Sequence, residues 1–406
     1  MYEDISTMDD FEFENKWVLL RIDINSTVIN GKIKDDERIR RHLRTIKELT
    51  EHDARVAILA HQGRPGEDDF TTLEPHAEIM SEELDNFEYV PDVFGPTAKK
   101  KIRSLEPGEV ILLENVRFYS EERINRDPEW HARRHLVRNL APLFDIFVND
   151  AFAAAHRSNA SLVGFTRRLP SCVGRVMERE IEVLETMVRE EMEDGVFVIG
   201  GSKIEDSIKV IRRAIEMDNV RRVLLGGLVG NLFLWASGVD LGKPSRKFLD
   251  MKGYTGYLDE ARELLEEGDD MILVPEDVAL NRGGEREEID VGELPADAPV
   301  FDIGNGTIER YCKEVERAGM VVANGPMGVY EEPGFEKGTY ELLNAIADSD
   351  AFSVIGGGHI IAAAKACGAY YHIDHVSTGG GAMLRMLAGE RLPAIDAILT
   401  CPFSGC

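Results

Sequence analysis

The chain has 406 residues, 43% of them hydrophobic, and its 74 acidic and 47 basic side chains give a formal net charge of −27. This length predicts two domains of roughly 150–200 residues each, and the hydrophobic content argues against disorder. A nucleic acid or an anionic membrane is disfavoured as a partner, because both require clustered cations, and the sequence has no run of about 18 apolar residues that could span a membrane. The acidic N-terminus lacks the apolar core of a signal peptide, and the five scattered cysteines fit free thiols in a reducing cytoplasm.

Strand-like and helix-like patterns alternate along the whole chain. In the first half, short apolar runs predict strands at 17–24, 54–60, 109–115 and 145–150. Apolar residues at helical spacing predict helices at 38–49 and 73–84. The second half repeats the order, with strands at 196–201, 221–227, 320–325 and 352–358 and helices at 203–217, 229–238 and 359–368. Residues 170–195 read as one long helical segment between the halves.

Continuous apolar strands that alternate with helices are typical of parallel sheets covered on both faces. The pattern occurs twice. We therefore predict an α/β fold with two doubly wound, Rossmann-like domains and mostly parallel sheets, joined by a long interdomain helix. The predicted bounds are 1–169 for the N-terminal domain, 170–190 for the interdomain helix and 191–388 for the C-terminal domain.

Four glycine clusters in the second half each follow a predicted strand or its turn and precede a helix. They are "IGGSKI" at 199–204, "LGGLVG" at 225–230, "IGGGHI" at 355–360 and "VSTGGGA" at 376–382. Glycine lets a phosphate approach the backbone, and helix N-termini present free N–H groups to it. The clusters predict a phosphate-binding edge, although "GGSK" lacks the spacing of a P-loop.

The strand ends of the first half carry a different chemistry. The segments "RIDIN", "DERI", "HQGRP", "NVRF" and "AHRSNAS" contribute cationic and hydrogen-bonding side chains: Asp23, Asn25, Arg38, His61, Arg64, Arg117, His156 and Arg157. Guanidinium groups grip phosphate and carboxylate in bidentate fashion. The set predicts a small polyanion bound without a metal.

On these motifs the chain resembles the phosphoglycerate kinase family. "LLRIDIN", "HQGRP", "LLENVRF", "GGSKIEDSI", "NGPMGVYE" and "VSTGGGA" occur in the family's order and at its approximate spacing over nearly the whole sequence. The resemblance implies two domains hinged about a long helix, with residues 389–406 packing back on the N-terminal domain. It also implies reversible phosphoryl transfer between 1,3-bisphosphoglycerate with MgADP and 3-phosphoglycerate with MgATP, as in glycolysis and gluconeogenesis.

The resemblance assigns site residues by matching motif. The implied 3-phosphoglycerate site on the N-terminal domain comprises Asp23, Ile24, Asn25, Arg38, His61, Gln62, Gly63, Arg64, Arg117 and Arg157. The implied nucleotide site on the C-terminal domain comprises Gly201, Ser202, Lys203, Gly226, Gly227, Gly304, Asn324, Pro326, Val329, Glu331, Gly357, Gly358, His359 and Ile360. The residues implied around the transferred phosphoryl group are Arg38, Lys203, Gly357 and Gly380.

The implied chemistry suits these residue types. The acceptor is a carboxylate that is already ionised, so no general base is needed. The transition state spreads negative charge over the phosphoryl oxygens, so catalysis rests on alignment and charge stabilisation. Arg38 from one domain and Lys203 from the other would surround that charge on hinge closure, which also excludes water.

Two positions depart from the common family pattern. Ser207 stands where a second lysine commonly follows "GGxK", and His359 stands where an aspartate commonly follows "GGG". We interpret them as a compensated loss of one cation and one anion, which resembles the archaeal branch. Lys209 is a poor replacement, because two residues turn a side chain by roughly 200° on a helix. Mg²⁺ with ATP or ADP is expected, but its protein ligands stay unknown, since Mg²⁺ prefers oxygen to histidine.

Three further clusters favour structural interpretations. "HIDH" at 372–375 follows a predicted strand that would turn its side chains to opposite faces, so zinc is not predicted there. "HARRH" at 131–135 reads as a solvated helix face without the glutamate of a metalloprotease. "CPFSGC" at 401–406 has no metal-ligand spacing.

Two alternatives remain open from the residues alone. One is a different small-molecule kinase with acyl-phosphate chemistry, and the other is a non-catalytic nucleotide-binding protein on the same fold. The presence of Arg38, Lys203 and Glu331 favours an active phosphoglycerate kinase. We expect a cytoplasmic monomer or homodimer whose partners are 3-phosphoglycerate or 1,3-bisphosphoglycerate and ATP or ADP, with no nucleic acid and no membrane.

Overall fold

The computed structural model describes residues 2, 4–188 and 192–403. The chain divides into two compact units, Met1–Glu185 with Arg391–Cys406 and Thr186–Glu390. Each unit is built on a six-stranded sheet in which all neighbouring strands are parallel. The predicted α/β class with doubly wound, mostly parallel sheets is confirmed.

The sheet of the first unit has the strand order β5-β6-β4-β1-β7-β8. In that order the strands are Phe87–Val90, Val110–Leu113, Arg55–Leu59, Trp17–Arg21, Ile146–Asn149 and Ser171–Val173. Val18 and Leu20 of β1 belong to the core on one face, and Leu19 belongs to the core on the other. Burial on both faces is why this strand reads as an unbroken apolar run. The helices are α1 (Glu37–Glu51), α2 (Glu74–Glu83), α3 (Pro96–Arg103), α4 (Pro128–His131) and α5 (His135–Leu140).

The sheet of the second unit has the strand order β11-β10-β9-β15-β16-β17. The strands are Ile272–Leu273, Val220–Leu225, Gly195–Ile199, Met320–Asn324, Phe352–Gly356 and His375–Ser377. Counted within this sheet, the order is that of a doubly wound nucleotide-binding fold, whose switch point lies between β9 and β15. Its helices are α7 (Ile204–Glu216), α8 (Gly227–Ala236), α9 (Gly242–Met251), α10 (Leu258–Gly268), α11 (Asn305–Glu316), α12 (Lys337–Asp348), α13 (Gly358–Cys367) and α14 (Gly380–Leu387).

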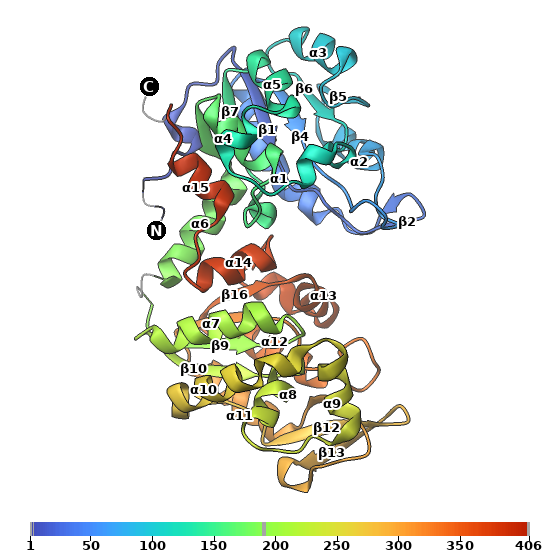
Figure 1. Cartoon of the computed structure of the whole chain (residues 1–406), viewed down its shortest axis with the longest axis vertical. Helices are drawn as coiled ribbons and strands as arrows, with labels where there is room; N and C mark the ends of the chain where they lie inside the picture. Colours follow the sequence, from blue (N-terminus) through green and yellow to red (C-terminus); the bar gives the residue numbers. More distant parts are fainter. Residues whose placement is uncertain (1, 3, 189–191, 404–406) are drawn as a thin grey trace. The chain divides into compact units, whose positions relative to one another are not determined.

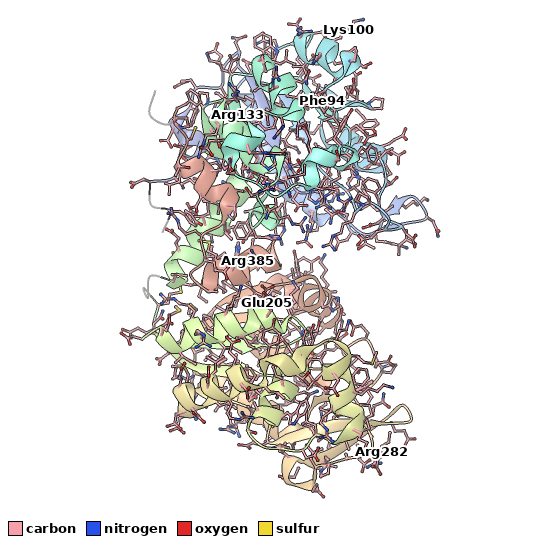
Figure 2. All side chains as sticks on the ribbon, in the orientation of Figure 1. Phe94, Lys100, Arg133, Glu205, Arg282 and Arg385 are labelled. Atoms are coloured by element: carbon pink, nitrogen blue, oxygen red, sulfur yellow. The ribbon has the colours of Figure 1, made fainter. Side chains whose placement is uncertain are left out.

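A small antiparallel sheet, β13-β12-β14, is added to the second unit. It comprises β12 (Asp277–Arg282), β13 (Glu285–Asp290) and β14 (Val300–Ile303). Arg282, labelled in Figure 2, closes the β12–β13 hairpin and forms an ion pair with Glu287. The sequence patterns did not predict this sheet.

The last described helix, α15 (Pro393–Leu399, labelled in Figure 1), belongs to the first unit. It packs against β8. Arg167 donates to the backbone oxygens of Ala397 (3.2 Å) and Thr400 (3.1 Å). The buried hydroxyl of Tyr2 accepts a 2.6 Å hydrogen bond from the Leu392 N–H. These bonds fix the C-terminal segment to the unit in which the chain begins.

Three local predictions are wrong. Residues 171–173 form strand β8, so α6 starts only at Arg175 and ends at Val188, and residues 189–191 of the predicted helix lie outside the described part. Ala369–His372 is a 3₁₀-helix, and the strand starts only at His375. "HARRH" is split between α4 and α5, and His131 is buried with Nε2 bonded to the Ser158 carbonyl, so it is no solvated face.

Of the helices in the part of the chain that the structure describes, none has the length and hydrophobicity that a membrane span requires.

Asp150, directly after β7, anchors the start of α6. Its Oδ1 accepts from the N–H groups of Val176 (2.8 Å) and Met177 (3.0 Å), and its Oδ2 binds His42 Nδ1 (2.8 Å) and the Thr45 hydroxyl (2.7 Å). The side chain is fully buried. A carboxylate at a helix N-terminus is favourable both as a cap and through the helix dipole.

We predict that Asp150→Asn lowers the free energy of unfolding by about 1–3 kcal/mol, because the amide can satisfy fewer of these donors than the carboxylate does. Urea denaturation followed by circular dichroism measures this change. Asp68→Asn, at an exposed position, is the control and should change stability by less than about 0.5 kcal/mol. Equal effects of the two substitutions would contradict the anchoring role.

Candidate functional sites on the two units

In the first unit, polar side chains gather at the carboxyl ends of the strands around the switch in strand order between β1 and β7. Asp23 and Asn25 follow β1, His61 follows β4, and Arg117 follows β6. The loops are tied together by hydrogen bonds. Asn25 Oδ1 accepts from the Gly63 N–H (2.8 Å), and Arg117 donates to the Gly63 carbonyl.

Arg21, the last residue of β1, is buried beneath this cluster. Its Nη2 lies 2.7 Å from His61 Nδ1, and its Nε donates to the Ser161 hydroxyl (2.8 Å), which in turn donates to Glu122 (2.6 Å). Burial lowers the pKa of Arg21 and raises the pKa of Glu122. Because a guanidinium only donates, His61 accepts at Nδ1 and carries its proton on Nε2. Burial, aided by the positive charge of Arg21, keeps the pKa of His61 well below its usual value, so the ring is neutral.

Three further guanidinium groups, those of Arg38, Arg117 and Arg157, add positive charge near Arg21. Burial, together with the charges of Arg157 and Arg21, lowers the pKa of Arg117 to about 10, and burial also lowers the pKa of Arg157. Arg38 lies 3.4 Å from Asp23 Oδ1. Burial would raise the pKa of Asp23, but its neighbours His61, Arg38 and Arg21 outweigh it and hold that pKa below the ordinary range. These guanidinium groups, held close together, are an arrangement that a bound polyanion would stabilise.

The other predicted residues of this set lie in different surroundings. Ile24 and Gln62 are fully buried, and the Gln62 amide donates to the Ser26 carbonyl (2.7 Å), which makes it a brace between loops. Arg64 is exposed and lies 3.8 Å from Glu67. His156 Nε2 accepts a 3.1 Å bond from Arg157. Buried residues such as Gln62 therefore fix the shape of the loops, whereas Arg64 and Arg157 supply positive charge.

The second unit contains a cavity of about 430 Å³ at the switch point of its sheet. Gly200 and Gly201 follow β9, and Asn324 and Gly325 end and follow β15. Three helices begin at its rim, with Lys203 preceding α7 and Gly227 and Gly358 opening α8 and α13. Glu205, labelled in Figure 2, and Asp206 lie in the first turn of α7, where negative charge stabilises the helix N-terminus. In α8 the N–H groups of Gly227, Leu228 and Val229 are already bonded to the Met327 and Gly201 carbonyls. The helix N-termini that can bind an anion here are therefore those of α7 and α13.

Most of the predicted nucleotide residues line this cavity. They are Gly201, Ser202, Lys203, Gly227, Asn324, Pro326, Val329, Glu331, Gly357, Gly358, His359 and Ile360. Gly226, Gly304 and Gly380 are not among the lining residues. A Cβ on Gly226 would meet Met327, and one on Gly304 would lie 2.3 Å from the Asp277 carboxyl carbon, so the fold itself requires glycine there. A Cβ on Gly380 would lie 2.7 Å from the Gly357 Cα, which shows how closely the two glycine loops approach.

The apolar wall of the cavity was missed by the sequence analysis. Pro275, Val278, Val300, Phe301 and Ile303 come from the antiparallel sheet and the loop before it, and Leu228 and Asn231 come from α8. Asp302, which also lines the cavity, is buried and accepts from Arg286 (2.8 Å) and the Gly338 N–H (2.8 Å). Arg286 also donates to the Gly334 carbonyl (3.0 Å), which joins the wall to the loop that carries Glu331.

The two departures from the family pattern lie in different environments. Ser207 is buried in α7, and no described residue bonds its hydroxyl. His359 is largely exposed, with Nδ1 3.7 Å from Glu331 Oε1. Lys209 forms a 3.0 Å ion pair with Glu390, so its amine is engaged elsewhere, in agreement with its exclusion as a replacement.

No group of three or more potential metal-ligating side chains occurs among the residues that the structure describes. In "HIDH", Asp374 accepts from the backbone N–H and the hydroxyl of Ser353, both at 2.8 Å. Those contacts are structural.

A guanidinium cluster on one doubly wound unit and a glycine-rich cavity at the switch point of the other are the features from which a kinase for a small anionic substrate was predicted. Residues 8–390 match the family model described as phosphoglycerate kinase. The chain is 96% identical over 406 residues, all of both chains, to a phosphoglycerate kinase of Methanopyrus kandleri. It is 45% identical to that of Pyrococcus furiosus, with 96% of each chain covered.

Solved structures agree. The crystal structure of phosphoglycerate kinase from Pyrococcus horikoshii matches with a TM-score of 0.90 at 45% identity, covering 97% of this chain and 98% of that one. The enzyme from Coxiella burnetii matches at 0.82 and 34% identity, covering 97% and 99%. The chain belongs to the phosphoglycerate kinase family and is a phosphotransferase with that activity. A non-catalytic role is therefore not favoured.

Gly358 is a position where a substitution can test ligand binding without disturbing the fold. A Cβ added there would meet no described protein atom within 4 Å, although the residue lines the cavity. We predict that Gly358→Ala leaves the melting temperature unchanged or slightly higher, because alanine favours a helix, but raises the nucleotide KM by about tenfold or more. Gly256→Ala, also in open space but away from the cavity, is the control. An unchanged KM in Gly358→Ala would show that nothing binds against this backbone.

Asp302 gives a pH-dependent prediction. Burial, only partly offset by Arg286, raises its pKa to about 6 from 3.8. The folded state therefore binds this proton more tightly than the unfolded state, and the resulting stabilisation is present at low pH and is lost as pH rises through about 6. Relative to Asp302→Asn, the wild-type free energy of unfolding should fall by roughly 2 kcal/mol between pH 4 and pH 7. Urea titrations of both proteins measure it, and a pH-independent difference would contradict the shift.

Proposed function

We propose that the chain transfers a phosphoryl group reversibly between 1,3-bisphosphoglycerate with MgADP and 3-phosphoglycerate with MgATP. The observation that carries this proposal is the guanidinium cluster of the first unit. In a chain of net charge −27, several arginines close together without enough carboxylates to neutralise them favour a highly charged anion as the ligand.

The first unit is proposed to bind 3-phosphoglycerate. Arg117, Arg157 and the Nε2–H of His61 can all donate to phosphate or carboxylate oxygens, and Arg38 can meet the group to be transferred. A neutral His61 suits this role, because it donates one directed hydrogen bond without adding a charge to the crowded cations. Asp23 and Asn25 keep Arg38 and the Gly63 loop in place.

The second unit is proposed to bind the nucleotide in its cavity. The apolar wall from the antiparallel sheet suits a planar base, and Glu331 can accept from ribose hydroxyls. Lys203 and the helix N-termini of α7 and α13 suit the phosphates. Mg²⁺ would arrive with the nucleotide, bound mostly by phosphate oxygens and water, because the described residues form no protein cage and Mg²⁺ readily keeps its waters.

The proposed reaction needs no general base, since the attacking carboxylate is already ionised. Arg38 and Lys203 stabilise the negative charge that spreads over the phosphoryl oxygens in the transition state. With one half of the site on each unit, transfer requires the units to close on both ligands. We further propose that the enzyme acts in the cytoplasm, in glycolysis and gluconeogenesis, as a monomer or a homodimer.

The test is ATP consumption with 3-phosphoglycerate and Mg²⁺, with the acyl phosphate trapped by hydroxylamine. We expect strong 3-phosphoglycerate-dependent turnover in the wild type and a kcat about 10²–10³ lower in Arg38→Ala, because a preorganised cation for the transition state is lost. Arg103→Ala, at an exposed position on α3, is the matched control and should retain wild-type turnover. Turnover without 3-phosphoglycerate, or full activity in Arg38→Ala, would refute the proposal.

A further inference from the structure

Asn231 is a buried amide that has no partner in the protein. It lies one turn into α8, four residues after Gly227, is 6% exposed, and lines the cavity of the second unit. Within the described residues, no side chain or backbone group forms a hydrogen bond with its carboxamide.

The other buried asparagines behave differently. Each of them donates a side-chain hydrogen bond to a backbone carbonyl. The distances are 2.8 Å from Asn115 to Gln62, 3.0 Å from Asn149 to Leu162 and 2.9 Å from Asn219 to Met192, and Asn324 donates to Gly356. The carboxamide atoms of Asn231 are not among the fully buried side-chain atoms that lack a partner, so the small exposed area of the residue includes them. An unpaired amide that borders the cavity is available to a ligand bound there.

The surroundings of Asn231 point to the chemistry of that partner. Leu228 lines the cavity from the same helix, and α8 packs against β14, whose Val300 and Ile303 form part of the apolar wall. An apolar wall that includes the Asn231 amide suits a planar ring that carries a donor and an acceptor side by side on one edge. Adenine has this edge, with its 6-amino group beside a ring nitrogen, and asparagine matches it in a bidentate manner.

We propose that Asn231 is a specificity-determining residue of the nucleotide site. Its Oδ1 accepts from the 6-amino group of adenine, and its Nδ2 donates to the neighbouring ring nitrogen. This assignment rests on the proposed function, in that it requires the cavity to bind the nucleotide.

The test compares ATP with purine riboside 5′-triphosphate, which lacks only the 6-amino group. We expect the wild-type kcat/KM to be about tenfold lower with the analogue, and mainly through KM, because the site then leaves Oδ1 unpaired. In Asn231→Leu and Asn231→Ala the two nucleotides should have equal kcat/KM, since the discriminating amide is gone. Asn86→Leu, at an exposed position, should discriminate like the wild type.

Each outcome decides the point. Equal use of both nucleotides by the wild type, or discrimination that persists in both Asn231 variants, would overturn the assignment while the kinase activity remains. Calorimetric binding of ADP and of purine riboside 5′-diphosphate to the same proteins separates recognition from turnover. Absence of 3-phosphoglycerate-dependent turnover in the wild type with either nucleotide would instead refute the proposed function, and the assignment with it.

Discussion

The proposed substrate site depends on holding several positive charges together in one small region of a strongly acidic chain. Arg21, the last residue of β1, supports this cluster from the buried side. It is buried, and its contacts to Ser161 and His61 hold it close to the half-buried cations of the cluster. Glu122 partly balances this charge through Ser161 without contributing a carboxylate to the surface.

The same backbone geometry underlies both proposed binding sites. In both units, parallel strands deliver their following loops to one edge, and the switch in strand order opens that edge to a ligand. The first unit fills its edge with guanidinium groups and a neutral imidazole. The second fills its edge with glycines, helix N-termini and one lysine, and adds an antiparallel sheet as an apolar wall. A substrate with two anionic ends suits the first arrangement, and a base joined to phosphates suits the second.

The central parallel strands were predictable because burial on both faces makes them nearly unbroken apolar runs, as in Phe197 and its neighbours, whereas β5 and β17 contain polar residues and were missed. The antiparallel sheet was not, because β13 reads as a charged segment, Glu285–Asp290, with no apolar run at all. Strand β8 has three residues and joins directly to α6, so the two merge in a helical pattern.

Some of the candidate residues could likewise be predicted from the sequence, and others could not. Motifs locate Arg117, His61 and Lys203, since these lie in short conspicuous segments at strand ends. Arg286 and Asp302 are 16 residues apart and meet only through strand pairing, and Asn231 is distinguished by the absence of a partner. Neither property is visible in the sequence. The functional roles of all these residues stay predictions.

The most direct test of the two-site account is a calorimetric titration of the full chain with 3-phosphoglycerate, with and without saturating MgADP. The account predicts one 3-phosphoglycerate per chain, bound whether or not the nucleotide is present, and weakened by about tenfold or more in Arg157→Gln. Competition between 3-phosphoglycerate and MgADP, or wild-type affinity in Arg157→Gln, would contradict the claim that the guanidinium cluster and the glycine-rich cavity are separate sites for the two substrates.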